Sequence, residues 1–292
     1  MEAELVYKIK ASLGEGPCWD TRNNILYWTD IAGNVIHQFD PVTKRNKTFS
    51  IGQMVGAVVV AEDGRLVLAA EHGFYYFDIT TNELVEISDP EKGNLDNRFN
   101  DGKVDPAGRF WAGTMQKNDT QPRGALYCLF ADHHIEEKLS GLRISNGIAW
   151  DLEKSRMYFI DTPTGNIYVF HYQKETGVIT NQRVAFPFPE EYGSPDGMTI
   201  DSEGMLWIAG WGSGQVTRWD PSTGKVLLTI KLAAKNITSC TFGGKDLDTL
   251  YITTARIGMT DQELENLPLS GSLFSVKPGV KGVPAYYFAN KP

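Results

Sequence analysis

Four side chains that carry a carboxylate or amide oxygen occupy matched positions along the chain: Glu15, Asn100, Asn146 and Asp196. Each lies 10 or 11 residues before a short apolar and aromatic segment, with a glycine one or two residues after it. Such oxygens suit a hard divalent cation, with Ca²⁺ as the first expectation and Mg²⁺ or Mn²⁺ as alternatives. Neither His nor Cys occupies these positions, so a typical structural zinc site is not expected. Asn-Gly and Asp-Gly pairs are also common in hairpin turns, which explains any one residue alone, but four at matched positions favour a metal site.

A metal held by these oxygens could assist a hydrolysis. A bound cation polarises a carbonyl group and lowers the pKa of its water, and Asp196 could serve both as ligand and as general base. Arg98 precedes Asn100 by two residues, so the two side chains share one face of a strand. A guanidinium there would hydrogen-bond a substrate hydroxyl or a developing oxyanion, although an ordinary surface arginine explains Arg98 equally well. The motifs of serine hydrolases, zinc peptidases and P-loop proteins are absent from the sequence.

A repeated strand pattern must position these residues. Six short apolar and aromatic segments recur every 40 to 49 residues, and a second strand-like segment follows each. The first segments span residues 26–28, 66–68, 110–112, 157–159, 206–208 and 250–252. A repeat of about 40 to 50 residues with four short strands is typical of β-propellers, whereas a β-sandwich does not explain six matching strand pairs. The sequence therefore predicts an all-β protein, one six-bladed β-propeller domain over residues 1–292 with four antiparallel strands per blade.

Turns and chain ends complete this prediction. The segments 105–108 and 201–204 carry Asp and Gly at the first and fourth positions of a type I turn. The innermost strand of each blade should precede the first apolar segment, which aims the four oxygen-bearing side chains at the central channel. Residues 5–10 have the pattern of a strand, and we expect them to complete the sixth blade. Residues 259–267 are compatible with one short helical turn.

Composition excludes several classes of partner. The formal net charge of −8 disfavours nucleic acid. No apolar run approaches the roughly twenty residues that span a bilayer, and the acidic start of the chain lacks the apolar core of a secretory signal. Cys18, Cys128 and Cys240 form no CxxC pair, so we expect reduced thiols in a cytoplasmic protein. The sequence indicates no protein partner.

The stretches around the oxygen-bearing residues resemble the gluconolactonase and regucalcin (senescence marker protein) family of sugar lactonases. The resemblance extends along essentially the whole chain, and the matching stretches are residues 13–20, 97–108, 124–127, 145–150, 195–198 and 238–244. It implies a six-bladed propeller that hydrolyses sugar lactones with one divalent metal ion. We expect Ca²⁺, with Zn²⁺, Mg²⁺, Mn²⁺ or Fe²⁺ as alternatives.

The resemblance also divides the candidate residues by role. It implies that the metal is held by Glu15, Asn146 and Asp196. It further implies that Asp196 is the catalytic acid and base, and that the sugar hydroxyls are bound by Arg98 and Asn100. Asn100 is thereby moved from the expected metal ligands to the substrate contacts.

The loop at residues 116–123 departs from the family pattern. One family member carries an acidic, substrate-contacting residue after the match at 113–115, whereas this shorter loop puts Asn118, beside Asp119, at the nearest position. We therefore expect Asn118 to contact the substrate, a small sugar lactone whose identity the sequence leaves open. Two alternative functions remain: a phosphotriesterase-type hydrolase on the same metal site, and a non-catalytic calcium-binding protein.

Overall fold

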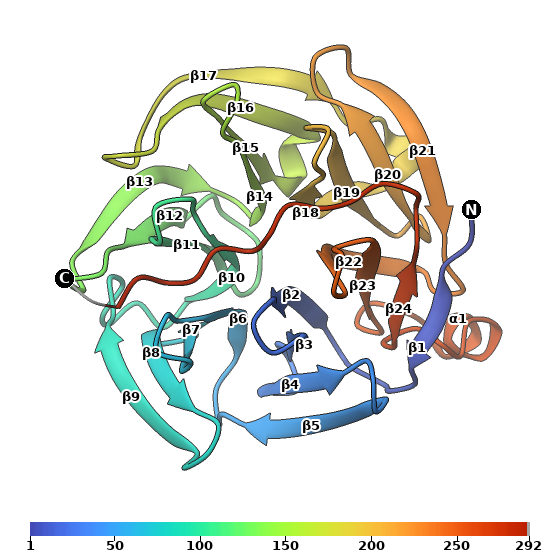
Figure 1. Cartoon of the computed structure of the whole chain (residues 1–292), viewed down its shortest axis with the longest axis horizontal. Helices are drawn as coiled ribbons and strands as arrows, with labels where there is room; N and C mark the ends of the chain where they lie inside the picture. Colours follow the sequence, from blue (N-terminus) through green and yellow to red (C-terminus); the bar gives the residue numbers. More distant parts are fainter. Residues whose placement is uncertain (291–292) are drawn as a thin grey trace.

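Six antiparallel sheets of four strands each form a ring around a central channel (Figure 1). The computed structural model describes residues 1–290. The prediction of an all-β six-bladed propeller is confirmed, and each blade runs from an inner strand beside the channel to an outer strand at the rim. Among the described residues, no helix has the length and apolar character needed to cross a membrane.

The strands of blades one to five follow each other outward in sequence order. The inner strands are β2 (Gly14–Asp20), β6 (Val55–Val60), β10 (Asn97–Val104), β14 (Ser145–Asp151), β18 (Ser194–Ile200) and β22 (Asn236–Gly243). The second strands are β3 (Ile25–Asp30), β7 (Leu66–Ala70), β11 (Phe110–Gln116), β15 (Arg156–Asp161), β19 (Leu206–Trp211) and β23 (Thr249–Ala255). The third strands are β4 (Val35–Asp40), β8 (Gly73–Asp78), β12 (Gly124–Leu129), β16 (Asn166–Gln173), β20 (Gln215–Asp220) and β24 (Leu273–Val276). The outer strands are β5 (Arg45–Ser50), β9 (Glu83–Ser88), β13 (Ile135–Leu142), β17 (Val178–Pro187), β21 (Lys225–Lys231) and, in blade six, β1 (Glu4–Tyr7).

Three short helices complete the secondary structure of the described residues: η1 (Thr162–Thr164), η2 (Glu190–Tyr192) and α1 (Asp261–Asn266). The last lies within the stretch predicted to form a helical turn. A capping box starts α1, because the Thr260 side chain accepts from the backbone N–H of Glu263 and the Glu263 side chain accepts from that of Thr260.

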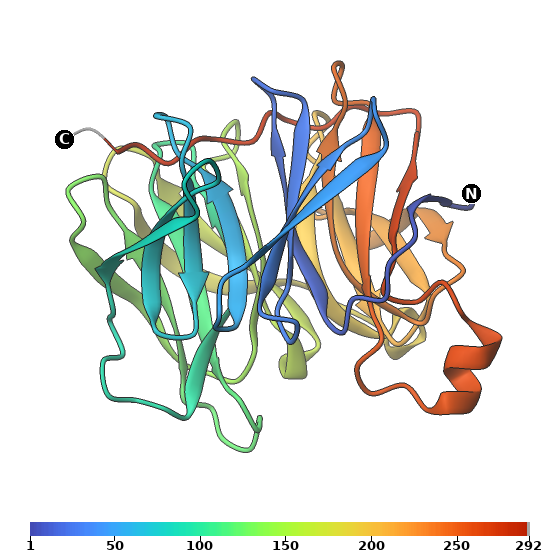
Figure 2. The same cartoon turned by 90° about the horizontal axis from the view of Figure 1, so that it is seen from below.

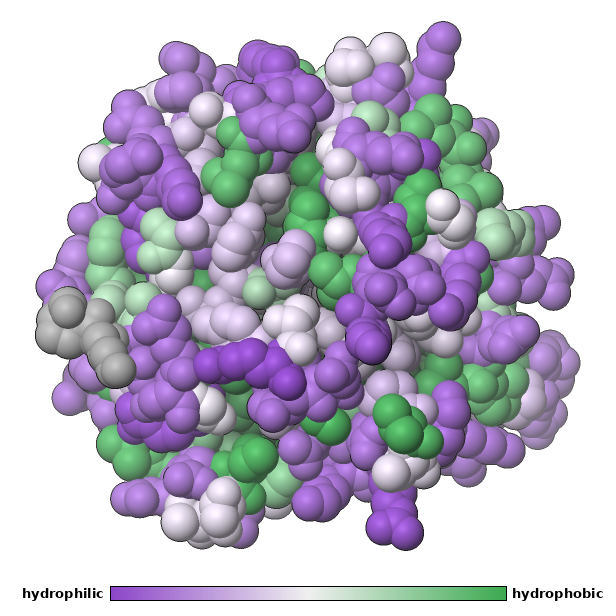
Figure 3. Space-filling model, in the orientation of Figure 1, coloured by the Kyte–Doolittle hydropathy of each residue, from purple (hydrophilic) through white to green (hydrophobic). Residues whose placement is uncertain are grey.

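The apolar and aromatic segments found in the repeat form the second strands and pack between blades. Phe74 of blade two lies against Phe99 and Phe110 of blade three, with ring centroids 4.7 and 5.5 Å apart. Successive strand residues point to opposite faces of a sheet, so each blade contributes to two such layers. On the face seen in Figure 3, hydrophilic residues occupy most of the periphery and the apolar patches are scattered.

Each inner strand is irregular at the same end of the channel. In all six blades, the pairing of the inner strand with its neighbour shifts by one residue. The shifts lie between residues 15 and 18, 55 and 57, 99 and 102, 146 and 148, 195 and 198, and 237 and 239. A bulge adds one residue to a strand and changes where the local side chains point. The four oxygen-bearing side chains lie at or within these shifts in blades one, three, four and five.

The two predicted Asp–Gly turns form as expected. Gly108 and Gly204 end them with φ angles of 82° and 76°, in the left-handed region that favours glycine. In the first turn, the buried Asp105 carboxylate accepts hydrogen bonds from the backbone N–H groups of Ala107 (2.9 Å) and Arg109 (3.0 Å). It therefore holds the turn closed from within.

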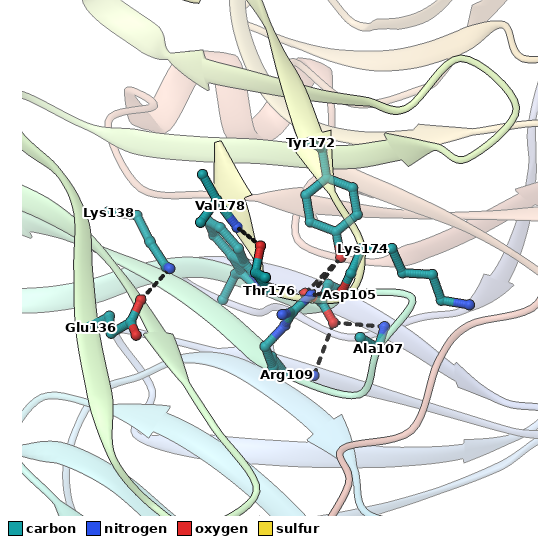
Figure 4. Close-up of polar contacts among 10 residues, drawn as sticks. Asp105, Ala107, Arg109, Glu136, Lys138, Tyr172, Lys174, Thr176 and Val178 are labelled. Atoms are coloured by element: carbon teal, nitrogen blue, oxygen red, sulfur yellow. Dashed lines mark hydrogen bonds and ion pairs between the residues drawn. The ribbon is translucent and has the colours of Figure 1, made fainter. Parts of the chain in front are cut away.

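The same carboxylate ties the turn to the blade core (Figure 4). Arg109 Nε donates to Asp105 Oδ2 at 2.7 Å, and the Tyr172 hydroxyl of β16 donates to the same oxygen at 2.9 Å. Trp111 Nε1 adds a third bond at 2.9 Å. Asp105 thus links blade three to blade four.

Blade five repeats this arrangement around Asp201. Its carboxylate accepts from the backbone of Glu203 (2.9 Å) and Met205 (3.0 Å), from Trp207 Nε1 (2.9 Å) and from Arg218 Nε (2.7 Å). Substitution of a buried carboxylate with this many donors is expected to lower the stability of the fold, because it leaves buried donors without an acceptor and weakens the pairing of a positive charge.

We expect Asp201→Asn to lower the free energy of unfolding by about 3 kcal/mol, since the amide cannot accept from all four donors and the Arg218 guanidinium keeps only its ion pair with the exposed Glu203. Urea unfolding followed by fluorescence measures this. The control is Asp78→Asn at an exposed turn, where the carboxylate accepts only from nearby backbone N–H groups, and it should change stability little. Equal stability of the two variants would contradict a special role for the blade-five network.

The ring closes through the N-terminal strand, as the sequence predicts. β1 pairs antiparallel with β24, with Leu5 opposite Phe274. Sheet six therefore combines three strands from the end of the chain with one from its start. A C-terminal strap, residues 277–290, then crosses one face of the ring, while α1 lies at the other face (Figures 1 and 2).

The strap is bonded to several blades. The backbone N–H of Ser202 donates to Lys281 O at 2.9 Å, that of Glu62 donates to Phe288 O at 3.0 Å, and that of Ala289 donates to Gly108 O at 2.9 Å. These bonds join the end of the chain to blades five, two and three. The strap therefore braces the ring on the face that it crosses.

Deleting residues 1–7 should lower the melting temperature by about 5–10 °C, because β24 becomes an unpaired edge and the two chain ends are no longer joined. The control is Leu5→Ser, which changes a side chain that is 40% exposed and keeps the backbone pairing. Differential scanning calorimetry compares the two. A deletion variant that melts with the intact protein would rule out closure by β1 as a source of stability.

Candidate functional site

A cavity of about 490 Å³ lies at the end of the channel where the inner strands are irregular. Five of the predicted site residues line it: Glu15, Arg98, Asn100, Asn146 and Asp196. They come from β2, β10, β14 and β18, which belong to four different blades. The carboxylate and amide side chains among them are buried, with exposed fractions of 4–6%. The predicted convergence on the channel is therefore seen for these five residues.

Neighbouring inner strands approach each other closely beside this cavity. A Cβ atom on Gly147 would lie 2.7 Å from the carbonyl oxygen of Asp196, and one on Gly197 would lie 2.1 Å from Ser239 Oγ. Such distances leave no room for a Cβ atom, so only glycine at these two positions allows the neighbouring inner strands to approach this closely. The close approach of β14 and β18 brings the Asn146 and Asp196 side chains to one place.

The Asn146 amide is held in one orientation. Its Nδ2 donates to Thr162 Oγ1 at 2.9 Å, and the Thr162 hydroxyl donates in turn to Pro195 O at 2.8 Å. On the other side of the amide, Oδ1 accepts from Asn100 Nδ2 at 3.2 Å. A carbonyl oxygen has two lone pairs, so Oδ1 can accept this bond and still bind a cation.

Arg98 and Asn100 form a connected pair. Arg98 Nη1 donates to Asn100 Oδ1 at 2.8 Å and to the carbonyl oxygen of Phe99 at 2.9 Å. Asn100 Nδ2 donates to Ser145 O at 2.9 Å, which fixes the amide between blades three and four. Both bonds of the guanidinium use Nη1, so Nε and Nη2 can donate to a ligand in the cavity.

The loop after β11 brings Asp119 to the cavity instead of Asn118. Asp119 lines the cavity together with Arg143, whose Nε donates to Asp119 Oδ1 at 2.9 Å. Asn118 is exposed at the turn and is not among the lining residues, and its Oδ1 accepts from the Thr120 hydroxyl at 3.1 Å. The expected contact of Asn118 with a substrate stays a prediction that this geometry does not support.

Comparison with known proteins identifies the family. A family model described as the SMP-30/gluconolactonase/LRE-like region matches residues 13–256. The chain belongs to this family. Regucalcin of Danio rerio is 40% identical over 293 residues, which cover 99% of this chain and 98% of that protein. YvrE of Bacillus subtilis (strain 168), whose name assigns it provisionally to the sugar lactone lactonases, is 39% identical over 289 residues, with 99% of each chain covered.

A solved structure agrees with this assignment. Regucalcin of Agrobacterium tumefaciens str. C58, described as a calcium-binding protein, superposes with a TM-score of 0.94. It is 26% identical, and the match covers 99% of this chain and 97% of that one. The resemblance to the gluconolactonase and regucalcin family is therefore confirmed over nearly the full length.

The pKa values of the two carboxyl groups in this cavity, Glu15 and Asp196, are both raised. Burial and the negative charge of Asp101 raise the pKa of the Glu15 carboxyl to about 8. Burial, followed by the charges of Glu15 and Asp101, raises the pKa of the Asp196 carboxyl well above its usual range. Burial also lowers the pKa of Arg98 to about 10, although Glu15 opposes that effect. A divalent cation between the carboxylates would relieve this repulsion.

The donor set of Glu15, Asn146 and Asp196 fits such a cation. Two carboxylates and one amide oxygen are the ligand types of Ca²⁺ and related hard metals. Within residues 1–290, no group of three or more His, Cys, Asp or Glu side chains could hold a metal ion. The Asn146 amide oxygen is therefore needed to complete a three-residue site, and three ligands leave room for water and substrate.

Several residues of the cavity were not predicted from the sequence. They include Thr162, Arg143, Trp211 and Ile257. Each lies at or just beyond the end of a strand on the cavity side of a blade. The signal that could have found them is therefore positional: the few residues that precede each inner strand and follow each second strand.

In the metal-free protein, affinity for Ca²⁺ should rise with pH up to about 8, because the metal must displace a proton from Glu15, whose pKa is about 8. Displacement of the Glu15 proton contributes about tenfold per pH unit below that value, and the raised pKa of Asp196 adds to the dependence. The same raised pKa means that the folded protein binds more protons than the unfolded chain between pH 4.5 and about 8. Across this window, the free energy of unfolding without metal therefore falls as pH rises.

Calorimetric titration with Ca²⁺ at pH 6, 7, 8 and 9 measures the affinity, and urea unfolding of the chelator-treated protein measures the stability. Glu15→Gln removes one of the two carboxyls whose pKa is raised, so its residual affinity should depend less steeply on pH, with Asp196 still titrating. An affinity of the unmodified protein that is constant from pH 6 to pH 8 would refute the proton displacement.

Proposed function

We propose that this protein hydrolyses sugar lactones to aldonic acids with one divalent metal ion, for which Ca²⁺ is the first candidate. The observation that carries the proposal is the convergence of Glu15, Asn146 and Asp196 from three blades on one cavity, beside the Arg98–Asn100 pair. Membership in the SMP-30/gluconolactonase/LRE-like family supports the same class of reaction. The three unpaired cysteines are in keeping with a cytoplasmic location.

The chain's own residues have distinct roles in this proposal. Glu15, Asn146 and Asp196 would hold the metal, which when bound polarises the lactone carbonyl and lowers the pKa of a water. Thr162 positions the Asn146 amide through its hydrogen bond. Arg98 and Asn100 bind hydroxyl groups of the sugar ring and orient the carbonyl toward Asp196.

Asp196 moves the proton in both halves of the reaction. As the water oxygen forms a bond to the carbonyl carbon, the Asp196 carboxylate takes the proton of the water. When the bond between the carbonyl carbon and the ring oxygen breaks, Asp196 returns that proton to the leaving alkoxide. Ring opening then gives the hydroxy acid with no net change in the protein.

A second candidate function is calcium binding without turnover. It is favoured by the description of the Agrobacterium tumefaciens relative as a calcium-binding protein. The two candidates differ in one property, because an ion buffer has no need for an oriented guanidinium beside the metal ligands.

We expect chelator treatment to abolish lactone hydrolysis and Asp196→Asn to lower kcat by at least about 100-fold, because the variant cannot take the proton of the attacking water. A pH-stat assay with five- and six-carbon sugar lactones measures the rates after reconstitution with Ca²⁺, Mg²⁺, Mn²⁺, Zn²⁺ or Fe²⁺. Full activity of Asp196→Asn would sink this mechanism.

The control variant is Asp220→Asn, a carboxyl on an outer turn that bonds only Ser222 and Thr223, and its rate should match the unmodified protein. Tight Ca²⁺ binding without turnover of any lactone would favour the calcium-binding function. Turnover of an organophosphate triester but of no lactone would favour a phosphotriesterase.

A further inference from the structure

The wall of the cavity combines polar and apolar side chains from five of the six blades. Blades three and four supply Arg98, Asn100 and Asn146 together with apolar groups such as Met115 and Ile144. Blades five, six and one supply the carboxylates of Asp196 and Glu15 together with the apolar Trp211, Ile257 and Leu13. Blades five and six are neighbours in the ring, and each contributes one large apolar side chain to the wall, Trp211 and Ile257. A ligand in this cavity therefore meets both hydrogen-bonding groups and apolar surface.

Trp211 differs from every other tryptophan of the chain. Six of the seven tryptophans are buried, and each stacks or packs against another aromatic ring. Trp211 is partly exposed at the end of β19, lines the cavity, and pairs with no aromatic ring among residues 1–290. Its indole therefore presents apolar surface to the cavity, which other residues leave uncovered.

Ile257 is also exposed on a fixed backbone. Its side chain is 45% exposed, although its N–H donates to Ser12 O at 2.9 Å and its carbonyl oxygen accepts from Asn236 Nδ2 at 2.9 Å. The segment is thus anchored on both sides of the peptide group. Exposure of an apolar side chain on an anchored segment at a cavity mouth favours contact with a ligand.

We infer that the substrate is a lactone that carries, besides the polar groups bound by Arg98 and Asn100, an alkyl or aryl substituent that lies against Trp211 and Ile257. The inference rests on the proposed lactone hydrolysis and narrows its substrate class. Contact of such a substituent with Trp211 and Ile257 removes apolar surface from water, which favours binding. A cavity of about 490 Å³ falls within the range of roughly 300–1,000 Å³ that holds drug-sized ligands, so a lactone ring with a short chain fits.

Three lactones with the same six-membered ring test this inference: δ-valerolactone, δ-nonalactone, which adds a butyl group, and D-glucono-δ-lactone. We expect kcat/KM for δ-nonalactone to exceed that for δ-valerolactone by about tenfold or more, since two buried methylene groups suffice for that factor. Ile257→Ser and Trp211→Ala should remove most of this advantage through KM, and should change D-glucono-δ-lactone hydrolysis less than about twofold. Trp211→Phe should keep most of the advantage.

The control is Val42→Ser, at a side chain that is 84% exposed on an outer turn, and it should leave all three rates unchanged. A loss in Trp211→Ala that falls on D-glucono-δ-lactone and spares δ-nonalactone would overturn the inference, since the indole would then be a platform for the sugar ring. Hydrolysis of D-glucono-δ-lactone with no gain from the butyl group would overturn it too, while leaving the proposed function intact. Hydrolysis of none of the three would overturn the proposed function together with this inference.

Discussion

Six inner strands converge on one axis, and each departs from regular pairing at the end where the cavity lies. The one-residue shift recurs in blades whose residues at that position differ widely, from Glu15 to Val55. It is therefore a property of the blade, and the ligand-bearing side chains exploit it. Close approach of neighbouring strands at Gly147 and Gly197 completes the arrangement, because side chains from different blades can then share one small volume.

Bringing two carboxylates together in this way has a cost. Glu15 and Asp196 are both buried, and burial together with the charge of Asp101 raises the pKa of each, while the charge of Glu15 also raises that of Asp196. The stability needed to hold them comes from elsewhere in the ring, from networks such as that of Asp105 and from closure by β1. In this respect the propeller is a rigid frame that keeps a locally unfavourable cluster in place, and a cation would turn that cluster from a cost into a binding site.

Much of this architecture could be predicted from the sequence because it repeats. Segment spacing gave the six blades, and matched offsets gave Glu15, Asn100, Asn146 and Asp196 one common location. The loop after β11 could not be predicted in the same way, since its conformation depends on contacts such as that of Asp119 with Arg143, a residue outside the loop. Trp211 could not be predicted for a related reason. Aromatic residues of second strands usually lie in the core, and a shift of one or two residues along the strand decides whether such a residue lies in the core or at the cavity.

Function in this fold arises where the six-fold repetition is broken. Blade two places Val55 and Gly56 at the shift and contributes no side chain to the cavity lining, whereas blades three and four contribute polar groups. Six identical blades would surround the channel with six equal groups, and six carboxylates there would repel each other beyond what one divalent ion can offset. The variation between blades therefore limits the negative charge at the axis, and it leaves room in the cavity wall for apolar side chains such as Trp211 and Ile257.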